Sequence, residues 1–451
     1  MMRSLLLRFV RAVLMLLLVL STACTSSLDS PKAVSIPSPH ATLSESMKAS
    51  ELFPIIDSIA QQVLVNMHKH AWNAGAMTHG VATGGLYINW KMDDPSVTNA
   101  VRAGTDGNPQ HNHDPQVDLL YLTALVEYDV LHPQERSFAG DIQRATGLVL
   151  NDFRSYNLPK GWIYFYLLRD GLTLQNADLV SEAHAVASNF YVRWYDAELG
   201  FVYNRNHTPG DYSTDHTIDC GAALIDAGLR WHQLDWVNAG ERTLDHTIAF
   251  ALDPTSHLFY NNMIVGSDGQ DKAQNYQAKP STQGEAVDEL LTAYSLTHRQ
   301  LYLDTVTLVL QSLFVSSGLW DAGQGGFFFA LDMQKGNLLR GYKETRSQSL
   351  VLVGLNHYNQ LMSAIKSQQG MARQQYVVQE QQLINVLTDK FYQRHYHGFF
   401  YRVTPDFRVF VSAVGQGIGT EDYFTTEAMG SALDGLQQTE LLMFTHKSGE
   451  S

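Results

Sequence analysis

Five short stretches of the sequence are rich in acidic and polar side chains, and each opens a segment with helical periodicity. They read HNHDPQVD (111–118), YSTDHTID (212–219), STQGEAVDE (281–289), YKETRSQS (342–349) and GTEDYFTTE (419–427). If these helix N-termini meet around one cavity, their positive ends favour carboxylates and polar ligands there. Two carboxyl groups on either side of a bond can act as an acid and as a base or nucleophile, which is the chemistry of glycosidic cleavage.

Several of these acidic residues have an alternative role in helix capping. Asp114 followed by Pro115 is typical of an N-cap and a first helical position. Carboxylates about one turn further in are not explained by capping, and on a buried helix each needs a partner or a function. The catalytic candidates are Asp118, Asp219, Glu285, Asp288 and Glu421. We expect Asp118 and Asp219 to form the acid–base pair, and which of them is the acid stays open.

Aromatic and polar side chains near the same stretches are candidates for sugar binding. Aromatic faces can stack on sugar rings, although each of these residues can equally be part of the core. The candidates are Trp90, Trp162, Tyr212, His216, Trp320, Arg346, Gln348 and Tyr423. The histidines and aspartates at 111–114 and 215–216 match no standard zinc or calcium spacing, so we expect no metal and no cofactor. The sequence has no serine elbow, phosphate loop or dinucleotide fingerprint.

Apolar residues recur at helical spacing through most of the chain, and twelve helices are expected. Their ranges are 46–72, 115–131, 133–153, 161–171, 174–195, 215–230, 232–252, 282–298, 299–316, 344–365, 372–394 and 422–441. The connections between them alternate between very short and long. That alternation is typical of stacked helical hairpins.

A short phrase of large apolar residues recurs in the long connections. Its copies are GGLY (84–87), GWIY (161–164), GFVY (200–203), HLFY (257–260), GGFFF (325–329) and GFFY (398–401). The copies lie about 60 residues apart on average, which is the length of two helices and two loops. We therefore expect an all-α (α/α)6 toroid of six hairpins, in which the first and last helices pair. Each phrase is expected to form a tight turn and a short strand at one mouth of the ring.

This organisation resembles the six-hairpin glycosidase superfamily. The stretch WDAGQGGFFFALDMQKGNLLRGYKETRSQSLVLVGL (320–355) also resembles a segment of N-acylglucosamine 2-epimerase-type proteins. In those proteins a turn leads through a lysine into an inner helix that begins with arginine and glutamine, and Lys343, Arg346 and Gln348 hold these places here. The resemblance implies a toroid that acts on carbohydrate.

The N-terminus has the pattern of a bacterial export signal. Three arginines precede an apolar run at 12–20, and the following Ser-Thr-Ala-Cys resembles a lipobox, which implies that Cys24 is lipidated. We expect a signal peptide at 1–23, a flexible tether at 24–45, the toroid at 46–441 and a tail at 442–451. The protein is then extracytoplasmic and bound to a membrane through its lipid.

Charge and cysteine content restrict the partners further. The net charge is −14, and nucleic-acid binding requires a basic footprint that such a chain does not offer. If Cys24 carries lipid, Cys220 has no cysteine to pair with, so the fold is expected to hold without a disulfide. We expect a monomer that binds an oligo- or polysaccharide.

Three functions remain open from the sequence. A glycoside hydrolase that uses two carboxylates is the first choice. A sugar epimerase or isomerase, or a polysaccharide lyase that uses Tyr212, His216 or Arg346, is the second. A non-catalytic glycan-binding lipoprotein is the third. Facing carboxyl groups in an open pocket would favour the hydrolase.

Overall fold

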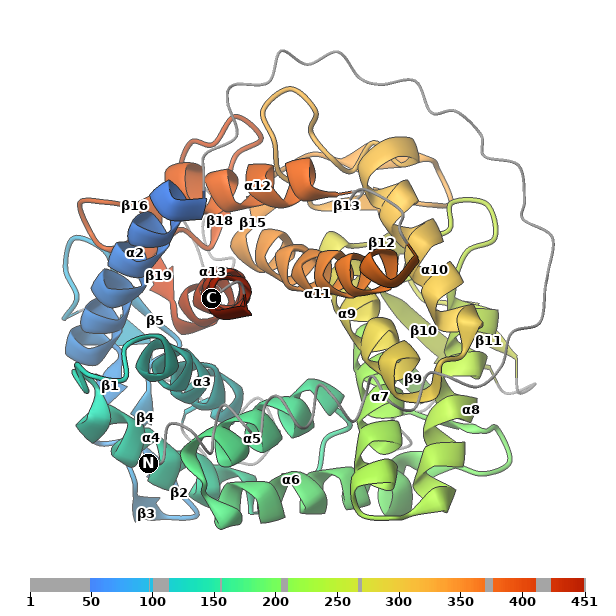
Figure 1. Ribbon diagram of the computed structural model, residues 1–451, viewed down its shortest axis with the longest axis horizontal. Helices are drawn as coiled ribbons and strands as arrows, with labels where there is room; N and C mark the ends of the chain where they lie inside the picture. Colours follow the sequence, from blue (N-terminus) through green and yellow to red (C-terminus); the bar gives the residue numbers. More distant parts are fainter. Residues whose placement is uncertain are drawn as a thin grey trace. The chain divides into compact units, whose positions relative to one another are not determined.

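A computed structural model describes residues 49–96, 98–99, 113–154, 156–203, 210–266, 270–369, 376–410 and 423–449. The chain from Ser46 onward forms one compact unit. The described residues of this unit include twelve α-helices, which are arranged as an inner and an outer ring (Figure 1). The predicted all-α (α/α)6 toroid is confirmed.

The two rings alternate along the chain. The inner helices are α3 (Pro115–Leu131), α5 (Gly161–Leu174), α7 (Thr214–Arg230), α9 (Pro280–Thr297), α11 (Thr345–Gln369) and α13 (Thr426–Gly449). The outer helices are α2 (Ala49–His70), α4 (Ala139–Phe153), α6 (Ala177–Asn189), α8 (Leu234–Ala251), α10 (Gln300–Gln311) and α12 (Val377–Asn385). One π-helical turn each follows α6, α10 and α12: η1 (Phe190–Trp194), η2 (Ser312–Ser316) and η3 (Val386–Phe391).

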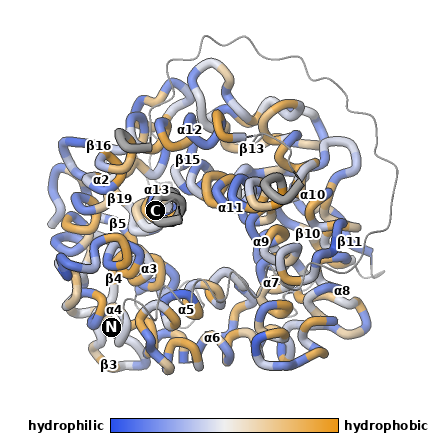
Figure 2. The backbone as a smooth tube through the Cα atoms, viewed as in Figure 1, coloured by the Kyte–Doolittle hydropathy of each residue, from blue (hydrophilic) through white to orange (hydrophobic). Residues whose placement is uncertain are grey.

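Contacts between neighbouring helices close the ring. Each inner helix packs against the next one, and α13 returns to α3, while α2 packs against α13 as expected for a first and a last helix. Hydrophilic and hydrophobic residues alternate along outer helices such as α4, α6 and α8 (Figure 2), as expected for helices with one buried face. Among the described residues, none of the helices has the length and apolarity needed to span a membrane.

Inner helix α7 and outer helix α8 pack closely where two of their glycines meet. A Cβ at Gly240 on α8 would lie 2.5 Å from the carbonyl oxygen of Gly221 on α7, which is too close for any side chain. The buried residues, among them Trp90, Tyr121, Tyr164, Phe190 and Phe259, form one hydrophobic cluster. Cys220 is a free, buried cysteine within it.

Short strands occupy the connections. They are β1 (Trp72–Asn73) with β4 (Gly85–Leu86); β2 (Met77–Thr78) with β3 (Val81–Ala82); β6 (Thr98–Asn99), β5 (Asn89–Lys91) and β19 (Tyr423–Thr425); β7 (Tyr195–Asp196) with β8 (Phe201–Val202); β9 (Gly210–Ser213), β10 (Asn262–Val265) and β11 (Asp271–Ala273); β12 (Gln277–Ala278), β13 (Ala330–Asp332) and β14 (Asn337–Leu339); β15 (Lys343–Glu344) with β18 (Arg402–Val403); and β16 (Tyr392–Gln393) with β17 (Gly398–Phe399). All of these pairs are antiparallel.

The recurring aromatic phrase takes the expected form in most of its copies. Three copies contribute strands β4, β8 and β17, and the phrases at 257–260 and 325–329 contribute single bridges. Gly200 turns with φ +83°, and His257 takes a similar φ of +54° where the phrase lacks its glycine. The copy at 161–164 differs, because it opens helix α5 instead of forming a strand. The helix predicted over 161–171 is therefore confirmed, and the short strand expected of each phrase does not form in this copy.

In four inner helices, the side chain of the fourth residue forms a hydrogen bond with the backbone of the aromatic phrase that precedes the helix. The contacts are Leu86 N to Asp118 Oδ1 at 2.8 Å, Thr217 Oγ1 to the Val202 carbonyl at 3.2 Å, Phe259 N to Gln283 Oε1 at 2.8 Å, and Phe327 N to Gln348 Oε1 at 2.7 Å. These four loops are thereby joined to the helices that follow them. The repeat in the sequence therefore reflects a repeated attachment between loop and inner helix.

Candidate active site

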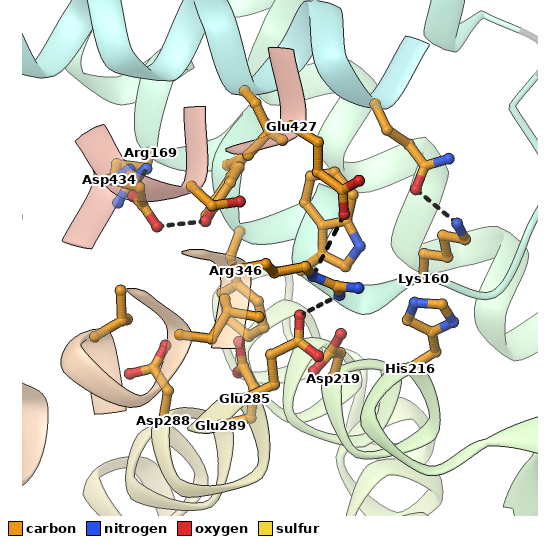
Figure 3. Close-up of a pocket in the computed structure, with 18 of the residues that line it drawn as sticks. Lys160, Arg169, His216, Asp219, Glu285, Asp288, Glu289, Arg346, Glu427 and Asp434 are labelled. Atoms are coloured by element: carbon orange, nitrogen blue, oxygen red, sulfur yellow. Dashed lines mark hydrogen bonds and ion pairs between the residues drawn. The ribbon is translucent and has the colours of Figure 1, made fainter. Parts of the chain in front are cut away.

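All six inner helices contribute side chains to one cavity of about 430 Å³ (Figure 3). It is lined by Asp114, Gln116, Val117, Leu120, Lys160, Trp162, Phe165, Tyr166, Arg169, His216, Asp219, Glu285, Asp288, Glu289, Thr292, Arg346, Leu350, Val353, Glu427, Ser431, Asp434 and Gln438. The sixth residue of every inner helix is among them, so this register faces the ring centre. The expected convergence of the polar helix starts on one cavity is therefore observed.

Asp219, the sixth residue of α7, is a fully buried carboxyl group on the cavity wall. Within the described part of the chain, neither carboxylate oxygen has a hydrogen-bond partner of normal geometry. Burial raises the pKa of Asp219 well above its usual value, and the nearby Glu285 and Asp215 raise it further, while the backbone N–H of Trp162 offsets part of the rise. Burial therefore favours the protonated form of Asp219.

The position of Asp219 depends on the neighbouring helix α5. Gly161, the first residue of α5, packs directly on the backbone of Asp219, and a Cβ at this glycine would lie 2.1 Å from the Asp219 carbonyl carbon. The glycine of the GWIY phrase is thus required by close approach of two helices. It also brings Trp162, the next residue, to the cavity wall.

Arg346 links two carboxylates that come from different helices. Its Nη2 lies 3.0 Å from Glu285 Oε1 on α9, and its Nε lies 3.7 Å from Glu427 Oε1 on α13. Burial raises the pKa of Glu285 to about 8, because the Arg346 charge offsets only part of the desolvation and the Asp215 carboxylate raises the pKa further. Glu427 is the more accessible of the two, with 37% of its side chain exposed against 10% for Glu285.

Asp215 lies behind this group and carries a negative charge. Burial would raise the pKa of Asp215, but His216, Arg346 and the Ser213 hydroxyl together hold it well below its ordinary value. Its carboxylate also accepts from the backbone N–H of His216 at 2.8 Å. This fixed negative charge helps to keep Asp219 and Glu285 protonated.

Asp219 and Glu427 enter the cavity from opposite sides. Their helices, α7 and α13, are three places apart in a closed ring of six, and Figure 3 shows Arg346 between the two carboxyl groups. Asp219 is fully buried, and Glu427 is partly exposed. The arrangement therefore places a buried carboxyl group and an accessible one on opposite sides of the cavity.

A third side of the cavity is formed by Lys160 and His216. Lys160 Nζ donates to Gln116 Oε1 at 2.6 Å, and burial lowers the pKa of this ammonium group. Burial also lowers the pKa of His216 to about 4, with Lys160 and Arg346 adding to the effect, so its imidazole is neutral near pH 7. A side pocket of about 200 Å³ shares these two residues and is lined in addition by Tyr212 and Tyr203.

The deep end of the cavity holds an ionic network that the sequence did not suggest. Arg169 on α5 contacts Glu127 at 3.1 Å and Asp434 at 3.2 Å, and the Tyr166 hydroxyl donates to Asp434 at 2.6 Å. Charged residues in the middle of apolar helices are the one signal that could have marked this network. Nearby, Asp288 Oδ1 lies 2.8 Å from His357 Nδ1.

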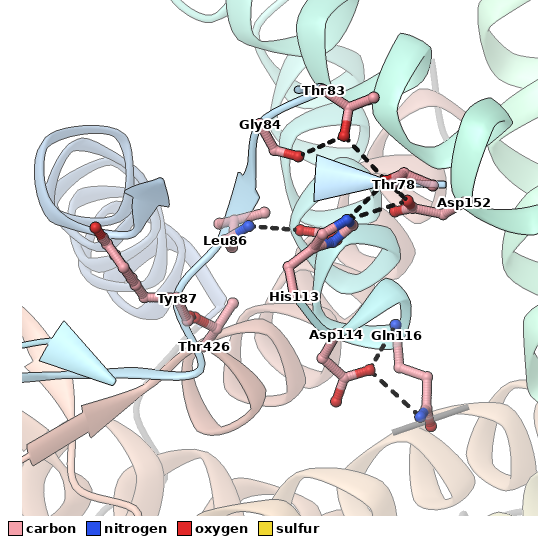
Figure 4. A network of polar contacts seen from close by, with 11 residues as sticks. Thr78, Thr83, Gly84, Leu86, Tyr87, His113, Asp114, Gln116, Asp152 and Thr426 are labelled. Carbon is pink, nitrogen blue, oxygen red and sulfur yellow. Dashed lines mark hydrogen bonds and ion pairs between the residues drawn. The ribbon is translucent and has the colours of Figure 1, made fainter. Parts of the chain in front are cut away.

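Asp118 lies outside this cavity and is not paired with Asp219 across it. Its carboxylate accepts from Leu86 N and contacts His113 Nδ1, within the network drawn in Figure 4. It is the fourth residue of its helix and Asp219 the sixth, and two residues turn an α-helix by about 200°. The two side chains therefore point in nearly opposite directions.

His113, Asp118 and Asp152 are the one trio of possible metal ligands found among the described residues, with ligand atoms within 4.8 Å of one another. Hydrogen bonds already occupy both ring nitrogens, because Nδ1 contacts Asp118 and Nε2 contacts Thr78 at 2.8 Å. We read the trio as a buried hydrogen-bond network that fixes the loop before α3. Asp114 is the N-cap of this helix, as expected, and accepts from Gln116 N at 3.0 Å.

The remaining candidates are divided between the cavity and its surroundings. Asp219, Glu285, Asp288, Trp162, His216 and Arg346 line the cavity. Trp90 is fully buried against Phe424, Trp320 packs on Phe314 and Phe327, and Gln348 is buried on the backbone of Phe327, so these three do not line it. Glu421, Cys24 and the side chain of Tyr423 lie outside the described residues.

The site residues that the sequence analysis missed are Lys160, Tyr166, Arg169, Glu289, Glu427 and Asp434. Glu427 stands at the end of the GTEDYFTTE stretch, so its neighbourhood was identified, although Glu421 was the glutamate named from that stretch. Since α13 begins at Thr426, Glu427 is its second residue and faces inward with Arg346, the second residue of α11.

Solved structures with a similar fold include several enzymes of carbohydrate chemistry. One is described as an unsaturated glucuronyl hydrolase specific for heparin, with 11% identity, a TM-score of 0.64, and coverage of 87% of this chain and 98% of that chain. A D-mannose isomerase has 10% identity and a TM-score of 0.63, with coverage of 91% and 100%. A family 76 glycoside hydrolase from a bovine Bacteroides thetaiotaomicron strain has 11% identity and a TM-score of 0.59, with coverage of 86% and 78%.

The sequence itself matches no protein-family model and no curated protein. At sequence identities near 11%, the structural similarity shows a shared fold and nothing further. The expected resemblance to the six-hairpin glycosidases is confirmed at that level: the chain has their (α/α)6 toroid fold.

Proposed function

We propose that this protein is a glycoside hydrolase in which Asp219 is the general acid and Glu427 the base or nucleophile. The observation that carries the proposal is the placement of a buried carboxyl group opposite an accessible carboxylate in one cavity. Among the described residues, the buried group has no hydrogen-bond partner of normal geometry. Two carboxyl groups that flank a glycosidic bond are the minimum that its hydrolysis requires.

The reaction divides between the two sides of the cavity. Asp219 donates its proton to the glycosidic oxygen as the bond to the anomeric carbon breaks. Glu427 supports the opposite face, either by taking a proton from water or by bonding to the anomeric carbon. Arg346 positions Glu427 through the 3.7 Å contact and ties it to Glu285.

The substrate class is supported by the fold neighbours and by the cavity wall. The neighbours are described as enzymes that act on heparin-derived uronides, on glycosides and on mannose. Trp162, Phe165 and Tyr166 line the cavity, and aromatic faces there can stack on the apolar face of a sugar ring. We therefore infer an oligo- or polysaccharide substrate.

A sugar isomerase or epimerase is a second candidate, favoured by His216. An imidazole that is neutral at pH 7 and lines the cavity can take a proton from a carbon next to a carbonyl group. One fold neighbour is described as a D-mannose isomerase. This reaction would convert monosaccharides without releasing new reducing ends.

Export and lipid anchoring remain part of the proposal, as does a monomeric state. Export and lipid anchoring are inferred from the N-terminal arginines, the apolar run and Cys24. Expression of the full chain in bacteria with labelled palmitate tests this: we expect labelled protein in the membrane fraction, and no label with Cys24→Ser. Unlabelled wild-type protein would refute the anchor.

Release of reducing ends from a panel of plant, fungal and bacterial polysaccharides tests the activity. We expect release by the wild-type protein and a 10²- to 10⁴-fold lower rate for Asp219→Asn, since general acid catalysis has about this magnitude. The exposed Asp235→Asn on α8 is the matched control and should behave as wild type. Full activity of Asp219→Asn would show that Asp219 is not the general acid.

Two other outcomes would favour another function. Conversion of monosaccharides without release of reducing ends would establish the isomerase, and binding without either reaction would establish a glycan-binding protein.

A further inference from the structure

The cavity contains more acidic side chains than the proposed reaction uses. Its wall includes Asp114, Asp219, Glu285, Asp288, Glu289, Glu427 and Asp434, against the cations Lys160, Arg169 and Arg346. Asp288, Glu289 and Asp434 have no part in the proposed chemistry. An excess of carboxyl groups in a substrate cavity bears on the charge of the substrate.

The three cations of the wall already have acidic neighbours. Arg346 contacts Glu285 and Glu427, and Arg169 contacts Glu127 and Asp434. Lys160 interacts electrostatically with Asp114 and Asp215. A uronate would therefore bring a further negative charge into a cavity whose cations already interact with carboxylates. This arrangement disfavours acidic sugars.

Glu289 is the least explained of the surplus groups. It lies on α9 one turn beyond Glu285, is only 7% exposed, and its Oε2 has no hydrogen-bond partner among the residues that the structure describes. The neighbouring charges that act on it most strongly are acidic: Asp288, Asp219, Glu285 and Asp226. A buried carboxyl group without a donor is costly, and a ligand that supplies a donor would remove the cost.

We propose that Glu289, with Asp288, forms a subsite for an ammonium group, so that the preferred substrate carries an unacetylated amino sugar. This inference rests on the proposed function, because it takes the cavity to be the substrate site. The carboxyl groups of Glu289 and Asp288 on α9 then face the amino group, while the sugar ring lies against Trp162, Phe165 and Tyr166.

The carboxyl groups of the cavity wall do not form a compact metal site. In the described residues, the only three His, Cys, Asp or Glu side chains with ligand atoms within 4.8 Å of one another are His113, Asp118 and Asp152, away from this cavity. An ammonium group on a sugar does not require three clustered ligands, because it can donate to one or two carboxyl groups, and aromatic rings nearby also favour a cation.

Protonation gives the subsite a measurable signature. Burial raises the pKa of Glu289 well above its usual value, and its acidic neighbours raise it further. An ammonium group bound beside it favours the carboxylate, so the pKa falls and a proton is released on binding. A neutral sugar would cause no such release.

Calorimetric binding to matched monosaccharides tests the subsite. Glucosamine, galactosamine and mannosamine are each compared with the N-acetyl form and the neutral hexose, and glucuronate is included, in two buffers of different ionisation enthalpy. For at least one configuration, we expect the free amine to bind about tenfold or more tightly than its N-acetyl form, equivalent to about 1.4 kcal/mol. Proton release should accompany this binding, and the preference should weaken with salt.

Variants assign the preference to the subsite. Glu289→Gln should bring the affinity ratio of amine to N-acetyl sugar close to one, and Asp288→Asn should reduce it, while the exposed Glu198→Gln should keep it. Melting curves establish that each variant is folded, and the Asp288 variant provides the test if the Glu289 variant is not. An unchanged ratio in both folded variants would overturn the proposal.

The outcomes separate this inference from the proposed function. Hydrolysis of neutral polysaccharides by a protein with no preference for amino sugars would keep the hydrolase and overturn the subsite. A preference for the amine in a protein without hydrolase activity would keep the subsite and overturn the hydrolase. Tightest binding of glucuronate, or no binding of any amino sugar, would also overturn the subsite.

Discussion

The backbone N–H of Leu86 donates to Oδ1 of Asp118 at 2.8 Å, and this bond ties the first aromatic phrase to the first inner helix. The same carboxylate contacts His113 Nδ1, and all atoms of both side chains are buried. Asp118 therefore serves to attach a loop, as do Thr217, Gln283 and Gln348 at the same position of later inner helices.

Substitution of Asp118 should therefore affect stability more than catalysis. In Asp118→Ala, the Leu86 N–H and a His113 ring nitrogen lose their acceptor in a buried region. We expect a loss of about 2–5 kcal/mol in the free energy of unfolding, since each unsatisfied buried donor costs about 1–3 kcal/mol. Urea unfolding measures this, with Asp235→Ala as an exposed control. Loss of activity in a fully stable Asp118→Ala protein would contradict the structural role.

Gln348 should act in the same way on the fifth hairpin. Its amide accepts from Phe327 N at 2.7 Å and donates to the Phe327 carbonyl at 3.2 Å. Gln348→Ala should lower the unfolding free energy by about 1–3 kcal/mol and speed hydrogen exchange at 325–329. Gln360→Ala, an exposed change on the same helix, is the control. Equal exchange rates in both variants would argue against the attachment.

Glu427 should be required for the reaction but not for the fold. More than a third of its side chain is exposed, so Glu427→Gln should melt close to the wild type. If Glu427 is the base, the hydrolysis rate should fall by about 10²- to 10⁴-fold. Glu198→Gln is the control. A folded Glu427→Gln protein with wild-type kcat would place the base elsewhere, with Asp114 as the next cavity carboxylate to test.

Because of Glu285, the free energy of unfolding should decrease as the pH rises. Its folded pKa of about 8 lies above the ordinary value of 4.5, so the folded state binds more protons than the unfolded state between these values. The contribution is complete below pH 4.5 and is lost as the pH rises through about 8. It can decline by up to about 1.4 kcal/mol per pH unit in this window.

Glu285→Gln imitates the protonated side chain and should flatten this decline. Urea unfolding of both proteins across the same pH range is the measurement, and Glu198→Gln serves as the control. The sign of the effect decides the interpretation: a wild-type protein that gains stability relative to Glu285→Gln as the pH rises would show that Glu285 is ionised in the folded state through its pair with Arg346.

Much of the fold could be predicted because its signals are local. Helical periodicity extends over most of the chain, and each predicted helix overlaps one in the structure. Only the ends differ, as at 133–153, where α4 begins at Ala139. The predicted ends near 195, 316 and 394 extend past the α-helices over π-helical turns that keep a similar periodicity.

The sequence predicted where the site lies, but it did not predict which side chains form it. Helix direction carries every polar N-terminus to one end of the ring, so the clusters named from the sequence do surround the cavity. The choice within each cluster requires the rotation of the helix, and an error of two residues turns a side chain by about 200°. This is why Asp219 was predicted to face the cavity and does so, while Asp118 faces the loop.

The sequence by itself determined twelve helices, their pairing into hairpins and the acidic character of one end, because these follow from periodicity and loop length along the chain. The tertiary structure alone decided which carboxyl groups share a cavity. Arg169 and Asp434 are 265 residues apart, and Asp219 faces Glu427 from across the ring. Such neighbours are set by ring closure and helix rotation, and neither leaves a pattern in a single sequence.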